Sequence, residues 1–164
     1  MDTNVRKTLN NLYLSLDNKR EGILSGLKSI QEEIHFKCGF YNGHYHKNDR
    51  SEYEKDYYPI PVVSIVGLCD IEIDFDNISI TSKLKKNNII DFEFIQFTQY
   101  RFEVYGVEDY LCDFGTEKSL NDMIKKIIES DESEFFITFY LPFNANVVDV
   151  LNLIKLLQTN SFFY

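Results

Sequence analysis

The chain has 164 residues, of which 44% are hydrophobic, and its formal net charge of −9 gives an isoelectric point near 4.8. This length suits a single domain over residues 1–164, which can bury enough surface to fold without a disulfide or a metal. The strong negative charge disfavours nucleic acid and anionic membranes as general partners, because both select a basic surface.

Residues 4–36 have the spacing of an amphipathic helix, within an N-terminal segment of residues 1–37. The apolar stripe has a gap at Lys19, where the weak helix formers Asp17, Asn18 and Gly22 predict a bend or a break. Either the stripe packs across the protein's own sheet, which the broken period favours, or it forms a coiled-coil seam between two molecules. The stripe consists of Val5, Leu9, Leu12, Leu16, Ile23, Leu27, Ile30 and Ile34.

Residues 38–60 have a different composition, rich in Tyr, Gly and charge, and follow neither the helical nor the strand period. They predict one long loop, and loops above about 12–15 residues are usually functional or disordered. Tyr provides large contact areas at protein interfaces. Tyr53, Tyr57 and Tyr58 are therefore candidate partner-binding residues, with rings folded over the sheet edge as the equal alternative.

Residues 69–84 alternate between apolar and polar side chains, and the phase changes at Asn77. This pattern predicts a half-buried antiparallel hairpin with a two-residue turn at Asp76-Asn77. In that register Asp70 lies opposite Lys83. The predicted apolar face contains Cys69, Ile71, Ile73, Phe75, Ile78, Ile80 and Leu84.

The rest of the chain predicts further strands and two helices. One helix begins at Ser119, with Asp122 as a weak capping box, and Asn144 caps another over residues 145–157. The segment 134–141 is apolar on both faces and is expected to be a central strand. The other strands are expected at residues 61–66, 92–97, 100–105 and 161–164. The core-facing residues of the last helix are expected to be Val147, Val148, Leu151, Ile154 and Leu157.

The order of these elements predicts an α+β fold. It would combine a long N-terminal helix with a mainly antiparallel sheet of five to six strands. Two C-terminal helices would pack on the sheet. Residues 61–164 would form both the sheet and these two helices.

Four metal-ligating residues fall within 12 residues of one another: His35, Cys38, His44 and His46. Imidazole and thiolate suit Zn²⁺, and four of them complete a tetrahedral site. The spacing matches no established zinc motif, however. The alternative is that His35 interacts with the C-terminal dipole of the helix and that the rest is a solvated loop.

A second candidate site is the alternating acidic row of Asp70, Glu72, Asp74 and Asp76. Residues 61–116 carry a net charge of −6, so the negative field belongs mostly to the sheet. Such a row can hold a hard cation or present an acidic strip to a basic partner. The alternative is the ordinary solvated face of an antiparallel sheet.

A third candidate is Cys112, beside Glu108, Asp109 and Asp113. Neighbouring negative charge raises the pKa of a thiol, so we expect a structural cysteine rather than a nucleophile. The chain contains no GxSxG, P-loop, GxGxxG or HExxH motif, which weighs against an enzyme.

Compartment and function follow from these patterns. Three cysteines without a short repeated spacing fit a reducing compartment, and the N-terminal segment does not resemble a signal peptide. The longest apolar runs are about half of a membrane span. We therefore predict a non-enzymatic cytoplasmic binding or assembly module, whose partner is another protein, for example a basic one, or a second copy of itself. The alternative is a zinc-binding enzyme or sensor that uses the His/Cys cluster.

Overall fold

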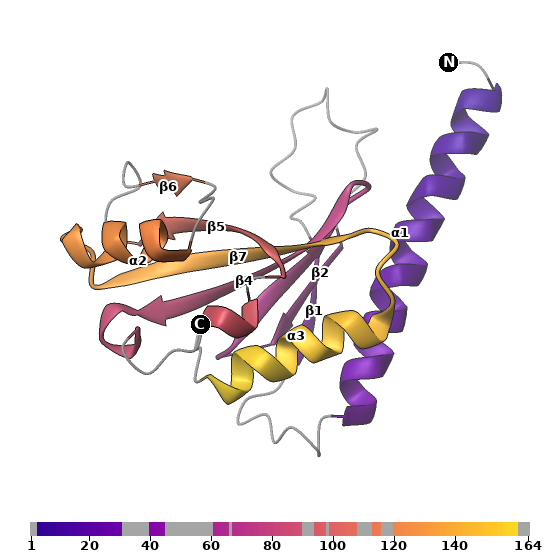
Figure 1. Cartoon of the computed structure of the whole chain (residues 1–164). Helices are drawn as coiled ribbons and strands as arrows, with labels where there is room; N and C mark the ends of the chain where they lie inside the picture. The colour runs from indigo at the N-terminus through magenta and orange to yellow at the C-terminus, as the bar shows by residue number, and fades with distance from the viewer. Residues whose placement is uncertain are drawn as a thin grey trace.

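The structure, a computed structural model, describes residues 3–30, 40–44, 61–65, 67–89, 94–97, 99–107, 113–115 and 120–160. It confirms the α+β class: an N-terminal helix is followed by an antiparallel sheet and further helices (Figure 1). The elements are α1 (Thr3–Ile30), β1 (Phe40–His44), β2 (Pro61–Ile65), β3 (Cys69–Ile73), β4 (Asn77–Lys85), η3 (Lys86–Asn88), η4 (Phe94–Phe97), β5 (Arg101–Gly106), β6 (Asp113–Gly115), α2 (Leu120–Glu129), β7 (Glu134–Pro142) and α3 (Val147–Thr159).

Within the described residues the sheet has seven strands in the order β1-β2-β3-β4-β7-β5-β6, and every neighbouring pair is antiparallel. β7 lies between β4 and β5, the central position that its two-sided apolar composition predicted. The predicted count of five to six strands was too low, because β1 and β6 add a short strand at each edge. β1 lies within residues 38–60, so the prediction of one long loop was wrong for residues 40–44, and β6 lies where no strand was predicted. An edge strand pairs on one side only and needs little apolar alternation.

The segment 92–97 is not the predicted strand where the structure describes it, because Phe94–Phe97 forms the 3₁₀ turn η4. Phe97 is buried, and its ring stacks on that of Phe139 with 4.9 Å between the centroids. A turn can bury an aromatic ring against the sheet as well as a strand can. The aromatic composition of this segment therefore did not distinguish a strand from a turn. β5 then follows within one residue of its predicted position.

The β3–β4 hairpin forms, but its register is displaced by two residues from the prediction. Asp70 lies opposite Thr81 rather than Lys83. The turn closes earlier because Asp74 organises it: its Oδ1 accepts the N–H of Phe75 at 2.6 Å, and its own N–H donates to the carbonyl of Asn77 at 2.9 Å. An even displacement keeps every strand residue on its predicted face. Only Phe75 leaves the apolar face, and it is 45% exposed.

Helix α1 is continuous through Gly22, so the helix is not broken there. The glycines lie instead where α3 crosses α1. A Cβ added at Gly26 would lie 2.8 Å from Val147 Cγ1, closer than any packed side chain allows. The ammonium of Lys19 donates to the carbonyl of Ala145 at this crossing. The gap in the apolar stripe therefore marks a close helix contact rather than a helix end.

Helix α3 begins two residues later than predicted, because Asn146 and not Asn144 is its N-cap. Asn146 and Asp149 form a reciprocal capping box, with hydrogen bonds of 2.9 and 3.2 Å. Val148, expected in the core, is 60% exposed, so that expectation was wrong. The buried side chains of α3 are Val150, Leu153, Ile154 and Leu157. α2 begins where the Ser119 signal predicted, and the predicted strand 161–164 lies outside the described residues.

One hydrophobic cluster holds the helices to one face of the sheet, here called the inner face. It contains side chains of α1, α2 and α3 together with alternate residues of β2, β3, β4, β5 and β7. The opposite set of alternate residues forms the outer face, which carries most of the polar side chains of the sheet.

Candidate functional site

The outer face of the sheet is the candidate functional site, because its strands bring chemically active side chains into neighbouring rows. One row runs from Asp70 through Thr81 and Thr138 to Glu103. The next row contains Glu72, Ser79, Tyr140 and Arg101 in the same order of strands. Residues far apart in the sequence therefore form one continuous polar surface.

Asp70 and Glu72 occupy the β3 part of this surface, and both are half-buried. They lie directly opposite Thr81 and Ser79, and their register partners in β2 are also uncharged. Burial raises the pKa of the Glu72 carboxyl, and the charge of Asp74 raises it further. The charged form of Glu72 is therefore disfavoured in the folded chain.

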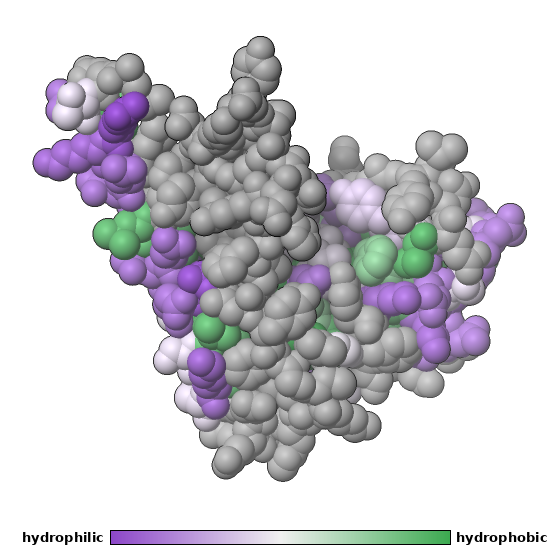
Figure 2. Space-filling view, turned by 180° about the vertical axis from the view of Figure 1, so that it is seen from behind, coloured by the Kyte–Doolittle hydropathy of each residue, from purple (hydrophilic) through white to green (hydrophobic). Residues whose placement is uncertain are grey.

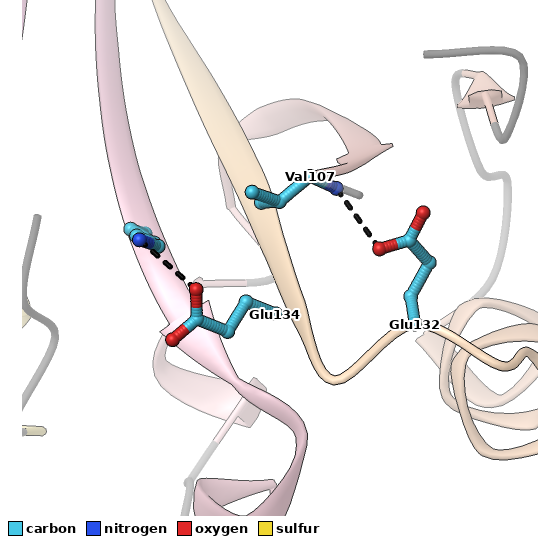
Figure 3. A network of polar contacts seen from close by, with 4 residues as sticks. Val107, Glu132 and Glu134 are labelled. Carbon is cyan, nitrogen blue, oxygen red and sulfur yellow. Dashed lines mark hydrogen bonds and ion pairs between the residues drawn. The ribbon is translucent and has the colours of Figure 1, made fainter. Parts of the chain in front are cut away.

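Lys83, which the sequence placed opposite Asp70, forms an ion pair with another residue. In the observed register it lies opposite Phe136, and its Nζ is 3.0 Å from the Oε2 of Glu134 (Figure 3). The displaced register thus assigns this cation to β7 instead of the acidic part of β3.

Glu103 is the centre of a second polar group on the same face. Its Oε2 accepts the hydroxyl of Tyr140 at 2.6 Å and that of Tyr105 at 2.5 Å. The guanidinium of Arg101 lies over the Tyr140 ring, 4.5 Å from its centroid. Burial is the largest of the influences that raise the pKa of Tyr140 to about 12; the hydrogen bond and charge of Glu103 act in the same direction, and Arg101 opposes them.

The Tyr140 hydroxyl and the Cys69 thiol both have raised pKa values. Tyr140 stays protonated near neutral pH, so it acts as a hydrogen-bond donor and not as a base. Cys69 is fully buried on the inner side, and burial, together with the charge of Asp70, raises the pKa of its thiol. A thiol of this kind is a poor nucleophile. Among the residues that the structure describes, no three His, Cys, Asp or Glu side chains are placed to hold a metal ion.

A separate polar region lies at the C-terminal end of α2 and is best explained as structural. The Lys86 ammonium donates to the carbonyls of Ile128 and Ser130 at 3.0 and 2.7 Å, which satisfies the open end of the helix. The buried Glu132 accepts the N–H of Val107 at 3.2 Å (Figure 3). A hollow of about 420 Å³ adjoins these residues, and its lining mixes both charge signs.

The remaining predicted site residues have different outcomes. Asp74 lies in the β3–β4 turn, where it has the structural role described above. Tyr53, Tyr57, Tyr58, His35, Cys38, His46 and Cys112 lie outside the described residues. The backbone of His44 ends β1 opposite Pro61, but its side chain is outside that description. The zinc site therefore stays a prediction.

Sequence reasoning missed the group around Glu103. Arg101, Glu103 and Tyr105 do alternate along their strand, which was a usable signal for one shared face. Tyr140 lies in a segment that appeared uniformly apolar, and only the pairing of β5 with β7 places it beside Glu103. None of the helices that the structure describes is both long and apolar enough to span a membrane.

Comparison with known proteins indicates the fold but no activity. No known family matches the chain, and no curated protein matches it. The conserved hypothetical protein Pfu-178653-001 from Pyrococcus furiosus is a solved structure that this chain resembles, with a TM-score of 0.61 and 18% sequence identity. The match covers 94% of this chain and 97% of that one. At this identity the chain is similar to that protein in its fold, over nearly the whole length of both.

Proposed function

We propose that the protein is a non-enzymatic protein-binding module, and that Asp70 and Glu72 on the outer face receive basic side chains of a partner protein. The observation that carries this proposal is the register of the sheet. It places the half-buried Glu72 opposite the uncharged Val62 and Ser79, with Asp70 on the same face of β3, and it leaves Lys83 beside Glu134. A Lys or Arg from a partner would offset the cost of keeping Glu72 charged in a half-buried position.

The rest of the outer face supports a protein as the ligand. Tyr140 on β7 and Tyr105 on β5 lie on the same outer face, with β4 between Tyr140 and the β3 carboxylates. Tyrosine provides both apolar area and a hydroxyl at interfaces. The Tyr-rich segment that contains Tyr53, Tyr57 and Tyr58 is proposed to add to this surface. The three cysteines without a disulfide spacing support a cytoplasmic location for the complex.

The first test compares two variants that change the net charge equally. In Asp70→Asn/Glu72→Gln, two carboxylates of the outer face become amides. In the control, Glu129→Gln/Asp131→Asn, the same change is made at exposed positions near the end of α2. Affinity capture at low salt should recover the same basic protein with wild type and control, and lose it with the outer-face variant.

A kinetic measurement on the captured partner then tests the electrostatics. Its association rate with wild type should fall as salt is raised, and the outer-face variant should show a slower rate with a flatter salt dependence. Equal capture and equal rates for the two variants would contradict the proposal, because charge at Asp70 and Glu72 would then be irrelevant to binding.

A further inference from the structure

The N-terminal half of α1, residues 3–15, projects beyond the body of the molecule (Figure 1). Every side chain described in this half is exposed, and Leu16 is the first buried residue of the helix. The segment contains three Asn and two Thr, residues of low helix propensity. Since short helices are marginal in water without packing, this half is expected to gain its stability from a contact.

An apolar stripe continues from the packed half of α1 into the projecting half. Val5 and Leu12 are seven residues apart and are 47% and 44% exposed, while Leu16 and Ile23 are seven residues apart and buried. At 3.6 residues per turn all four fall on one side of the helix. Figure 2 shows apolar patches that interrupt the hydrophilic surface along α1. Leu14, which is 57% exposed, falls on the opposite side.

We infer that the projecting halves of two copies of this chain pair side by side, antiparallel, and form a two-fold symmetric dimer. A seven-residue apolar spacing is the spacing by which two helices interlock their side chains. A two-fold axis brings the same stripe against itself, so one stripe provides both halves of the interface. In the antiparallel alignment, Val5 of each copy lies beside Leu12 of the other.

Charge decides between the antiparallel and parallel alignments. The projecting half contains Arg6 and Lys7 and no acidic residue, whereas the β3–β4 turn contains Asp74 and Asp76. The β3–β4 turn lies at the end of the sheet from which α1 projects. Asn77, at the end of that turn, pairs with Pro142, and Lys19 of α1 contacts the carbonyl of Ala145 three residues further along the chain. Antiparallel helices bring the basic end of each copy toward the acidic turn of the other. Parallel helices would instead place the four basic side chains together.

The size of the contact predicts a weak dimer. Thirteen helical residues extend about 20 Å, and a strip of this length is small beside the roughly 1,200 Å² that stable complexes bury in total. The two charged contacts must therefore contribute, which makes the dimer dependent on salt. We expect a dissociation constant in the micromolar range. This inference concerns a different surface from the outer face and does not depend on the proposed function.

The decisive experiment is sedimentation velocity on the full chain from about 10 to 500 µM, the range that spans such an affinity. Wild type should change from monomer to dimer with concentration. Leu12→Asp should weaken dimerisation at least tenfold, while the matched control Leu14→Asp, with the same charge and a more exposed leucine, should leave it unchanged. Both positions are exposed, so circular dichroism should show that both variants fold. The inference is overturned if the wild type stays monomeric, which would mean that another segment or only solvent covers the stripe. It is also overturned if the two variants dimerise equally.

Two further variants test the arrangement. Under mild oxidation, Val5→Cys mixed with Leu12→Cys should give a cross-linked dimer, and Val5→Cys alone should give no more than the wild type. Asp76→Lys, at an exposed position that has no part in closing the turn, should weaken the dimer, and adding Arg6→Glu/Lys7→Glu to the same chain should restore it. Cross-linking of Val5→Cys with itself, or no rescue by the reversals at Arg6 and Lys7, would overturn the antiparallel assignment.

Discussion

The two faces of the sheet are built from the same strands and have opposite chemistry. On the inner face, Ile71, Ile80 and Phe139 are almost completely buried under the helices. On the outer face, the alternate residues Glu72 and Glu103 are half-buried carboxylic acids. The comparison indicates that the inner face accounts for most of the stability, whereas the outer face holds groups that burial makes costly to charge.

The largest expected difference between the faces comes from two adjacent residues of β4. Ile80→Ala removes a fully buried side chain and should lower the free energy of unfolding by about 2–5 kcal/mol. Ser79→Ala, next to it on the outer face, should change the same quantity by less than about 0.5 kcal/mol. Urea denaturation measures both. Equal losses would mean that the outer face is packed as tightly as the inner one.

A second test concerns the packing of helices over the inner face. Gly26→Ala would place its Cβ 2.8 Å from Val147 and should destabilise the chain by about 1–3 kcal/mol. Gly22→Ala meets Val147 at 3.6 Å, an ordinary contact, and should stabilise by up to about 1 kcal/mol through helix propensity. Thermal unfolding should show opposite signs. Val147→Ala combined with Gly26→Ala should recover most of the loss, which would attribute it to Val147 rather than to Leu151, whose Cδ1 the new Cβ would meet at 3.2 Å.

On the outer face, the raised pKa of Glu72 predicts a pH dependence of stability. The carboxyl binds its proton more tightly in the folded chain than at its ordinary pKa of 4.5. Its contribution to stability is therefore present below pH 4.5 and is lost as the pH rises through the folded value. Glu72→Gln should accordingly be more stable than wild type at pH 7, and this advantage should disappear in acid. A variant less stable at pH 7 would show that a cation inside the chain compensates the charge.

The smallest expected effect is spectroscopic. Glu103→Gln removes the negative charge beside the Tyr140 hydroxyl and should lower the pKa of Tyr140 below about 12, because burial alone then remains to raise it. Ultraviolet titration of tyrosinate, with Tyr140→Phe to identify the transition, measures the change. An unchanged pKa would show that Glu103 does not control this hydroxyl.

Short-range patterns predicted most of the fold. The α1 stripe, the alternation in β3 and β4, and the two-sided apolar composition of β7 each reflect the direction of successive side chains, which depends only on local backbone geometry. Where the prediction was wrong by two residues, as at Asp74 and Asn146, a side chain closed a turn or capped a helix, and equally suitable residues stood nearby. Sequence patterns of this kind do not show which of several neighbouring residues will close the turn or cap the helix.

The sequence by itself determined the fold class, the separation of apolar from polar faces and the acidic row of β3, because each depends on the spacing of residues within one segment. Only the tertiary structure decided what those residues face. Lys83 forms an ion pair with Glu134 instead of lying opposite Asp70, and the Tyr140 hydroxyl donates to Glu103. The absence of a side chain at Gly26 allows α3 to pack closely on α1. Each of these depends on pairing between distant segments, which the packing of the whole core selects.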